Sequence, residues 1–306
     1  MIQITYNGVD ITQSVSVNRC HHDMYAAGQS DTLDLRMNDI RGLWDAWGPA
    51  AGDEIRVDFG TISTGTMFVA GVTPQNGYTK ILAQSAPRSG FEAQYKAWQK
   101  VRFLQLGEEI AARNGLAFSS YGVTDRLYSY IVQDGVGDFP FLHHRAQLEG
   151  CAFLIYDKRL ILYSEQYMES IAPSDVLKVL DDGQYQYQDR RSEMYGSCIV
   201  EAGGYSGEFT AGNGSSRVYR PKDLGNIGGA DEAKRFAKGL LRAVNKGCCS
   251  GFVRSNILTG YAAASVIQLS NSRAPSWDGS VFLDHVRNDY GQGTSKLFFR
   301  RLLEGY

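Results

Sequence analysis

The segment from Gln133 to Ser164 constrains the fold most strongly, because helical periodicity gives way to strand periodicity at a single glycine. Asp138 can act as an N-cap acceptor and Pro140 suits a first helical turn. Apolar residues then recur at three- and four-residue spacing until Gly150, which favours a left-handed helix end. We therefore predict a helix over 139–149.

Two short apolar runs, CAFLIY and RLILY, follow this helix directly. Only Asp157 and Lys158 separate them, and so short a connection between aliphatic and aromatic runs favours a tight reversal. We predict a β-hairpin over 151–163.

The first 87 residues predict a β-barrel-like domain. Alternating apolar and polar positions mark strands in IQITYNG, DTLDLRM, DEIRVDFG, GTMFVAGV and YTKILAQSA. Turn signals stand at Asn7-Gly8, Gly52-Asp53 and Asn76-Gly77. Leu43, Trp44 and Trp47 are expected to cover one end of this sheet, which we favour over an aromatic ligand site.

Residues 88–170 predict a small α+β domain. Residues 88–100 are charged and are expected to form an exposed connection. Phe103, Leu106, Ile110 and Ala111 share one face of a helix predicted over 103–114. The helix at 139–149 and the hairpin at 151–163 complete this domain.

Residues 171–306 predict a second β-barrel-like domain. Apolar positions at helical spacing predict a long helix over 231–246, packed on a sheet made by residues 250–255, 264–270, 279–286 and 295–302. A glycine-rich stretch at 203–216 is expected to form a mobile polar loop. The fold class is therefore mainly β, with two similar antiparallel domains and an α+β insertion.

An internal similarity supports two domains built alike. GTMFVAGV at 65–72 and GSVFLDHV at 279–286 share Gly, Phe and Val at the same three places, and each leads through a glycine-bearing turn into another strand. Three identities in eight are weak support by themselves. Two similar domains in each chain of a trimer would present six similar units around an axis.

Charge and composition restrict the function classes. Lys and Arg total 31 against 33 for Asp and Glu, so avid or sequence-specific nucleic-acid binding is disfavoured, and with it a transcription regulator. No signal segment and no apolar run of membrane-spanning length occurs, so we expect a cytosolic product without membrane insertion. The five cysteines lack CxxC spacing and are expected to be reduced and buried.

No catalytic, metal or cofactor site is predicted. The pairs His21-His22 and His143-His144 are adjacent, so their imidazoles diverge instead of converging on a metal. Nothing near Cys151, Cys248 or His285 suggests an activated thiol. The acid pairs Glu108-Glu109 and Asp181-Asp182 are adjacent, whereas a glycosidase sets two carboxyl groups about 5 to 9.5 Å apart across a groove. Phosphate-loop and zinc-protease motifs are absent from the sequence.

The central segment resembles the small domain of baseplate hub proteins from phage tails and related contractile injection machines, the family often named late control protein D. The matching residues are Gln133, Asp138, Phe141, Leu142, Gly150, Leu160 and Tyr163. The C-terminal region is similar to the last strands of the same family, through Leu241, Arg242, Asp289, Tyr290, Gly291, Gly305 and Tyr306.

This resemblance implies a structural protein of the virion baseplate, assembled in the host cytoplasm. Its implied partners are itself as a homotrimer, the tail tube or a tube-initiator protein, a separate spike or tip protein and other baseplate proteins. Tape-measure protein and then DNA would pass through the ring. The alternative is a tail-tip peptidoglycan hydrolase with its site in 88–170, for which Asp138 is the residue to test.

Overall fold

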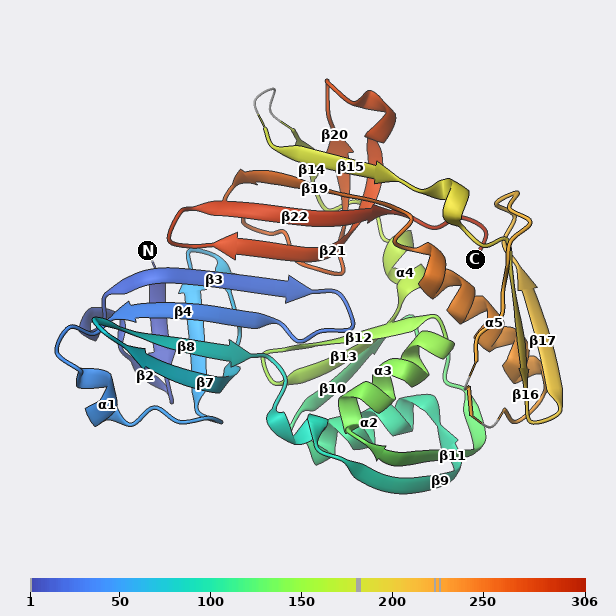
Figure 1. Ribbon diagram of the computed structural model, residues 1–306, viewed down its shortest axis with the longest axis horizontal. Helices are drawn as coiled ribbons and strands as arrows, with labels where there is room; N and C mark the ends of the chain where they lie inside the picture. The colour runs from blue at the N-terminus through green and yellow to red at the C-terminus, as the bar shows by residue number, and fades with distance from the viewer. Residues whose placement is uncertain (1, 180–182, 223, 226) are drawn as a thin grey trace.

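A 14-stranded sheet dominates the computed structural model, which describes residues 2–179, 183–222, 224–225 and 227–306 (Figure 1). Its strands are β1 (Ile2–Tyr6), β2 (Val9–Asp10), β3 (Val17–Tyr25), β4 (Thr32–Asn38), β5 (Glu54–Phe59), β6 (Ile62–Ser63), β7 (Met67–Gln75), β8 (Tyr78–Gln84), β14 (Val176–Lys178), β15 (Tyr185–Asp189), β19 (Cys249–Asn256), β20 (Val266–Ser270), β21 (Gly279–Asp289) and β22 (Thr294–Arg301). They follow the order β15-β19-β22-β21-β3-β4-β8-β7-β5-β1-β2, with β6, β14 and β20 attached beside this path.

The sheet contains one five-strand arrangement twice. In the first copy the strands are ordered β3-β4-β8-β7-β5, and in the second they are ordered β15-β19-β22-β21 with β20 paired to β21. Both copies are antiparallel throughout. Each has its own apolar core on one side of the sheet.

Matching irregularities support this correspondence. An extra residue, Ala70, bulges from the pairing of β7 with β8, and Asp284 bulges from the pairing of β21 with β22. These two residues occupy the same sixth place in the eight-residue segments that look alike in the sequence. Both segments also begin with a glycine at positive φ, Gly65 and Gly279. The internal similarity is therefore present in the strand pairing.

The prediction of barrel-like domains is confirmed only as two antiparallel β units. Among the described residues no sheet closes on itself, because the path ends at β15 on one side and at β2 on the other. Strand β3 was not among the predicted strands. Its outward side chains include Arg19, His21 and Asp23, while His22 points inward, so the usual alternation of apolar and polar residues is hidden.

The small α+β unit contains α2 (Phe103–Arg113), α3 (Asp138–Leu148), and a three-stranded sheet of β10 (Ala117–Tyr121), β12 (Cys151–Tyr156) and β13 (Arg159–Ser164). Both predicted helices and the hairpin are confirmed within a residue or so at each end. Gly150 has the expected positive φ, and Asp157 and Lys158 form the tight turn, also with positive φ. Asp138 does not cap α3, because the N-cap residue is Gly137.

The expected exposed connection at 88–100 is wrong in its second half. Residues there form β9 (Gln94–Arg102), which pairs with β11 (Leu127–Val136) as a two-stranded ribbon. Trp98 and Val101 point into the core, while most other side chains of β9 are exposed. Charge on one face of the ribbon concealed the two buried positions.

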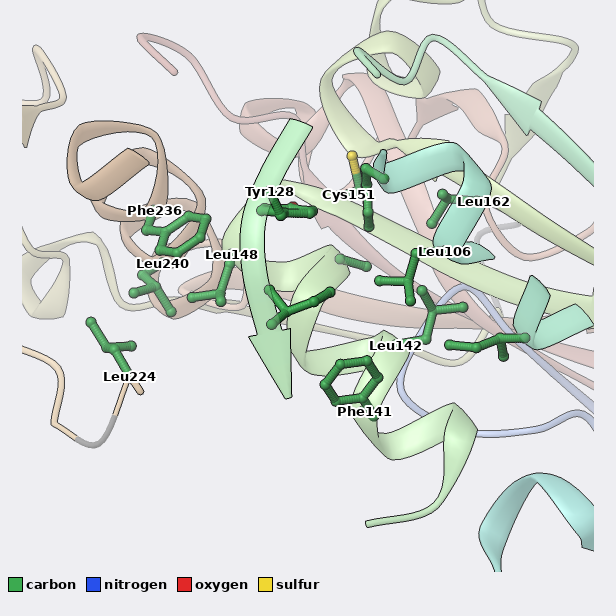
Figure 2. Packing of buried hydrophobic residues seen from close by; sticks show 14 of the residues in the cluster. Leu106, Tyr128, Phe141, Leu142, Leu148, Cys151, Leu162, Leu224, Phe236 and Leu240 are labelled. Atoms are coloured by element: carbon green, nitrogen blue, oxygen red, sulfur yellow. The ribbon is translucent and has the colours of Figure 1, made fainter. Parts of the chain in front are cut away.

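The predicted long helix exists as α5 (Ala230–Asn245), but its predicted packing partner is wrong. It lies against β17 (Tyr205–Thr210), β16 (Ser197–Ala202) and α3, not on the 14-stranded sheet. Strand β16 also pairs with β18 (Val218–Tyr219). Figure 2 shows Phe236 and Leu240 of α5 in the same apolar cluster as Leu148 and Tyr128 of the α+β unit.

The mobile loop expected at 203–216 is also wrong in part, because residues 205–210 are β17. Gly203 and Gly204 both have positive φ and form the two-residue turn between β16 and β17. Gly207 brings β17 close to α5, since a Cβ there would lie 2.2 Å from the backbone nitrogen of Lys234. Gly203 and Gly204 therefore form the turn of a hairpin, and Gly207 allows that hairpin to pack closely against α5.

Two short helices complete the fold, α1 (Leu43–Trp47) and α4 (Glu165–Ser170). Trp44 is buried and packs edge-on against Tyr6, at a centroid distance of 6.3 Å, as expected for a lid. Leu43 and Trp47 are more than half exposed, so only one of the three predicted lid residues is buried.

Substitution of Gly239 by Ala should destabilise the protein. A Cβ at this position of α5 would lie 2.3 Å from the carbonyl oxygen of Leu148 and 2.6 Å from that of Gln147. Overpacking of this kind costs about 1–3 kcal/mol, which exceeds the usual gain of Ala over Gly in a helix. Thermal and urea unfolding should show the loss, whereas Gly247→Ala, with no atom within 4 Å of its Cβ, should leave stability nearly unchanged.

Candidate functional site

The residues that carry the family resemblance lie mostly where the units of the fold meet. Phe141, Leu142, Leu160 and Leu241 belong to the apolar cluster shared by the α+β unit and α5. The polar members form three hydrogen-bonded groups.

The first group surrounds Asp138, which is fully buried. Its Oδ1 accepts hydrogen bonds from Arg113 Nη1 at 2.9 Å and Gln133 Nε2 at 3.0 Å, and its Oδ2 accepts one from Asn114 Nδ2 at 2.8 Å. Gln133 Nε2 also donates to the carbonyl of Val136 at 2.8 Å. Asp138 therefore ties α2, α3 and β11 together, and its carboxylate has no room for a substrate.

The second group is a buried ion-pair network between α4, α5 and β22. Arg242 Nε lies 3.2 Å from Glu165 Oε2, and Lys246 Nζ lies 2.7 Å from Glu165 Oε1. Arg242 and the fully buried Arg300 both contact Glu169. A single carboxylate thus holds two buried guanidinium groups.

The pKa directions follow from this arrangement. Burial raises the pKa of Glu165, but the charges of Lys246, Arg300 and Arg242 outweigh burial and hold that pKa below its ordinary value. Asp284, the bulged residue of β21, lies 3.1 Å from Arg300 Nε, yet burial raises its pKa overall. The network connects the second β unit to α4 and α5.

The third group lies at the seam where β21 pairs with β3. His21 Nε2 lies 2.9 Å from Asp289 Oδ2, and His285 Nε2 lies 2.6 Å from Asp23 Oδ1. The ring of His285 stacks between Tyr25 and Phe298 at centroid distances of 4.4 and 4.5 Å. These contacts join strands about 260 residues apart in the chain.

Tyr290 anchors the inner side of this seam. Its hydroxyl lies 2.9 Å from Nδ1 of the fully buried His22, and its ring stacks on Phe59 at 5.2 Å. Gly291 follows in the turn after β21, where a Cβ would lie 3.4 Å from Asp289 Oδ1.

The remaining motif residues link segments that are far apart in the chain. The hydroxyl of Tyr163 donates to the carbonyl of Ala26 at 2.6 Å, which links the α+β unit to the first β unit. Tyr306 is buried, its carbonyl accepts from Gln166 Nε2 at 2.7 Å, and its hydroxyl contacts Asn245. Gly305, just before it, has positive φ.

The candidate catalytic groups do not form a site. Burial raises the pKa of Cys151 to about 12 and also raises that of Cys248, so neither thiol is activated. All five cysteines are free, as predicted, although Cys249 is only half-buried. Glu109 pairs with Arg113 and Glu108 is exposed, while Asp181 and Asp182 lie outside the described residues.

No three His, Cys, Asp or Glu residues in the described chain are grouped to hold a metal ion. Within the same residues no helix combines the length and apolar character needed to cross a membrane.

Solved structures with the same fold exist, although no family model and no curated protein matches the sequence. A tail protein from Neisseria meningitidis MC58 aligns with a TM-score of 0.76 at 11% identity, over 98% of this chain and 96% of its own. The 43 kDa tail protein of prophage MuSo2 from Shewanella oneidensis aligns with a TM-score of 0.75 at 11% identity, over 98% of both chains.

A third neighbour is an Escherichia coli component of the type VI secretion system, described as structurally similar to the phage T4 tail proteins gp27 and gp5. It aligns with a TM-score of 0.64 at 11% identity, over 99% of this chain and 78% of its own. At this identity the three likenesses establish the fold.

Replacing Glu169 with Gln should destabilise the protein strongly. The amide keeps the shape but leaves Arg242 and Arg300 without their shared negative charge. Breaking a buried ion pair by removing one partner costs about 3–5 kcal/mol. Chemical denaturation should detect this loss. The exposed Glu208, replaced by Gln, should change the free energy of unfolding by no more than about 0.5 kcal/mol.

Acid should destabilise the protein in part through His22. Burial lowers the pKa of His22 to about 4, whereas an unfolded histidine titrates at about 6.5. The unfolded chain therefore binds the extra proton first, so stability is complete above about pH 6.5 and falls as the pH drops toward 4.

His22→Phe should remove this part of the pH dependence. Between pH 7 and pH 4.5 the wild type should lose about 2 kcal/mol more than the variant, measured by denaturant unfolding at each pH. Tyr290→Phe removes the hydrogen-bond partner but keeps the titrating group, so it should retain the wild-type slope. Equal slopes for wild type and His22→Phe would contradict the assignment.

Proposed function

We propose that the chain is a structural hub of a phage-type tail, a homotrimeric ring that joins the tail tube to a separate spike or tip protein. Two findings support a role in a tail: the fold is that of tail proteins and a secretion-system component, and the hub-like motif residues occupy the junctions of this fold. We expect the ring in the virion baseplate, after assembly in the host cytoplasm.

The observation that carries the proposal is the head-to-tail order of the two five-strand copies in one sheet. Within the chain the second copy joins the first where residues 285–289 of β21 pair with residues 21–25 of β3. The corresponding segments at the two outer edges are residues 71–75 of β7 and residues 186–190 at β15. Neither segment has a partner on its outer edge among the described strands.

Unpaired edges of this kind are templates for adding another strand. Two molecules could meet in the same way as the two five-strand copies meet within one chain. Residues 71–75 of one molecule would then pair with residues 186–190 of the next. Such a head-to-tail contact forms a ring when its rotation closes. Three chains would then supply six similar units around one axis, as the resemblance to hub proteins implies.

The seam within the chain also predicts the register between chains. It places Arg287 opposite Asp23. Thr73 and Gln188 occupy the corresponding positions at the outer edges, because matching strand pairs in the two copies have matching registers. We therefore expect Thr73 of one chain to face Gln188 of the next.

Pro74 modifies this edge. The two-residue turn after β7 makes Gln75 and Tyr78 a hydrogen-bonded pair, so the nitrogen of Pro74 lies on the side away from β8. This edge offers one donor fewer than an uninterrupted strand, which hinders pairing with unrelated strands. In the proposed contact, the backbone N–H and C=O of Val72 are still able to form hydrogen bonds with the next chain.

One face of the continuous sheet would line a channel. The side chains that point away from the two apolar cores are largely polar or charged and include Lys80, Arg254, Arg287 and Lys296. A water-filled passage for tape-measure protein and then DNA needs a polar wall of this kind. The tube, the spike and other baseplate proteins would contact the ends and periphery of the ring.

Nothing in the described part of the chain favours the peptidoglycan hydrolase alternative. Asp138, on which it depended, is buried and fully hydrogen-bonded. We accordingly assign no catalytic residue and no cofactor.

The double variant Thr73→Cys/Gln188→Cys should form a covalent trimer on mild oxidation. Residues that face each other without hydrogen bonding in antiparallel strands have Cα atoms about 4.5 Å apart, within the range that a disulfide spans. Non-reducing gel electrophoresis should show a ladder that ends at three chains. Light scattering on the wild type, alone and with neighbouring tail proteins, gives the uncrosslinked mass.

Two controls make this experiment specific. Thr73→Cys/Gln186→Cys keeps both thiols on the same face but moves one by two residues, about 7 Å along the strand, and should cross-link poorly. A mixture of the two single variants should stop at covalent dimers. The ring proposal would be contradicted if the chain stayed monomeric in the presence of every tail protein and the cysteine variant formed no cross-link.

A further inference from the structure

A small cationic pocket lies where α5 meets the start of α4 and the segment that connects β10 to β11. Its volume is about 180 Å³. Four cationic side chains line it, Arg126, Arg235, Lys238 and Arg242, against a single carboxylate, Glu149. The pocket lies away from the strand edges of the proposed ring, although two residues of the family motif, Gly150 and Arg242, line it.

The one carboxylate is already occupied. Both Oε atoms of Glu149 lie 3.2 Å from the guanidinium of Arg235, and Oε1 also accepts the hydroxyl of Tyr128 at 2.9 Å. Glu149 and Arg235 therefore neutralise each other, and neither Lys238 nor Arg126 has a carboxylate left for it in the pocket.

Two of these cations have no acidic partner in the described part of the chain. Lys238 Nζ has one hydrogen-bond contact, with Gln166 Oε1 at 3.5 Å, and lies 5.7 Å from the ring centre of Phe209. Arg126 makes no side-chain hydrogen bond or ion pair with any described residue. Burial, and next the charge of Arg242, lower the pKa of Lys238, as expected where positive charge is uncompensated.

Arg242 supplies an independent indication of a ligand. Only 3% of its side chain is exposed; its Nε pairs with Glu165 and its Nη2 with Glu169. Its Nη1 is buried and has no hydrogen-bond partner among the described residues. A buried donor without an acceptor destabilises the fold, and the cost is larger when the donor is charged. An acceptor that enters from the pocket would remove this cost.

We propose that this pocket binds one oxyanion group, a phosphate or a carboxylate, between Lys238, Arg126 and Arg242. Charge-assisted hydrogen bonds from lysine and arginine are the strongest means of holding such a group. The volume equals about six waters at roughly 30 Å³ each, which suits a single oxyanion and its residual hydration but not a nucleotide. Free phosphate and an acidic side chain of a partner protein share this chemistry.

Calorimetric titration of the purified full-length chain with inorganic phosphate tests the proposal, with chloride adjusted to keep the ionic strength constant. We expect saturable binding and a rise in the unfolding temperature. Lys238→Gln/Arg126→Gln should weaken binding about a hundredfold or more, because it removes two charge-assisted hydrogen bonds and each contributes about a factor of ten or more.

Lys234→Gln is the matched control, since Lys234 is exposed one turn earlier on α5 and does not line the pocket. It should bind phosphate like the wild type. A second titration uses N-acetyl-aspartate amide as a lone protein-type carboxylate. Binding of phosphate alone supports a free ion, and binding of the aspartate derivative supports a partner's acidic side chain.

Two results would overturn the assignment. One is the absence of saturable binding and of thermal stabilisation by both probes at constant ionic strength. The other is equal binding by the wild type and Lys238→Gln/Arg126→Gln, which would move the anion elsewhere. Neither result bears on the ring, because Thr73 and Gln188 lie outside this pocket.

Discussion

The pairing of β21 with β3 is the contact on which the rest of the architecture depends. It makes two β units into one sheet and joins residues about 260 positions apart. Loop closure over such a distance costs entropy before any contact forms, so we expect each β unit to form before the seam does. Side chains on the outer face add hydrogen bonds across the seam, between His21 and Asp289 and between Asp23 and His285.

The same seam explains why the chain has unpaired edges. When two copies meet head to tail, each keeps one strand edge without a partner. Among the described strands these edges are residues 71–75 and 186–190. A symmetric back-to-back contact would have used identical edges and left none of this kind. These are the two edges that the proposed head-to-tail contact would use, and the missing N–H of Pro74 would restrict which strands can pair there.

Buried charge is concentrated where the units of the fold meet. Arg300, Arg242, Glu165 and Glu169 sit between the second β unit and the helices α4 and α5. Well-packed apolar residues would often be at least as stable at such a place. The ion pairs instead require particular partners at particular distances, which fixes how α5 lies relative to the sheet. Arg242, whose Nη1 has no partner among the described residues, belongs both to this network and to the lining of the cationic pocket.

Local sequence patterns determined the helices at 103–114, 139–149 and 231–246, the hairpin at 151–163 and most strands of the first β unit, because periodicity and turn residues act over short distances. Only the tertiary structure decided which surface α5 covers, that residues 205–210 form a strand beneath it, and that β3 lies at the centre of the sheet. Close approach at Gly207 and Gly239, and pairing between strands at opposite ends of the chain, depend on distant residues. The cationic pocket is a mixed case: Lys238 and Arg242 are one turn apart on α5, but Arg126 joins them only when a separate segment packs against that helix.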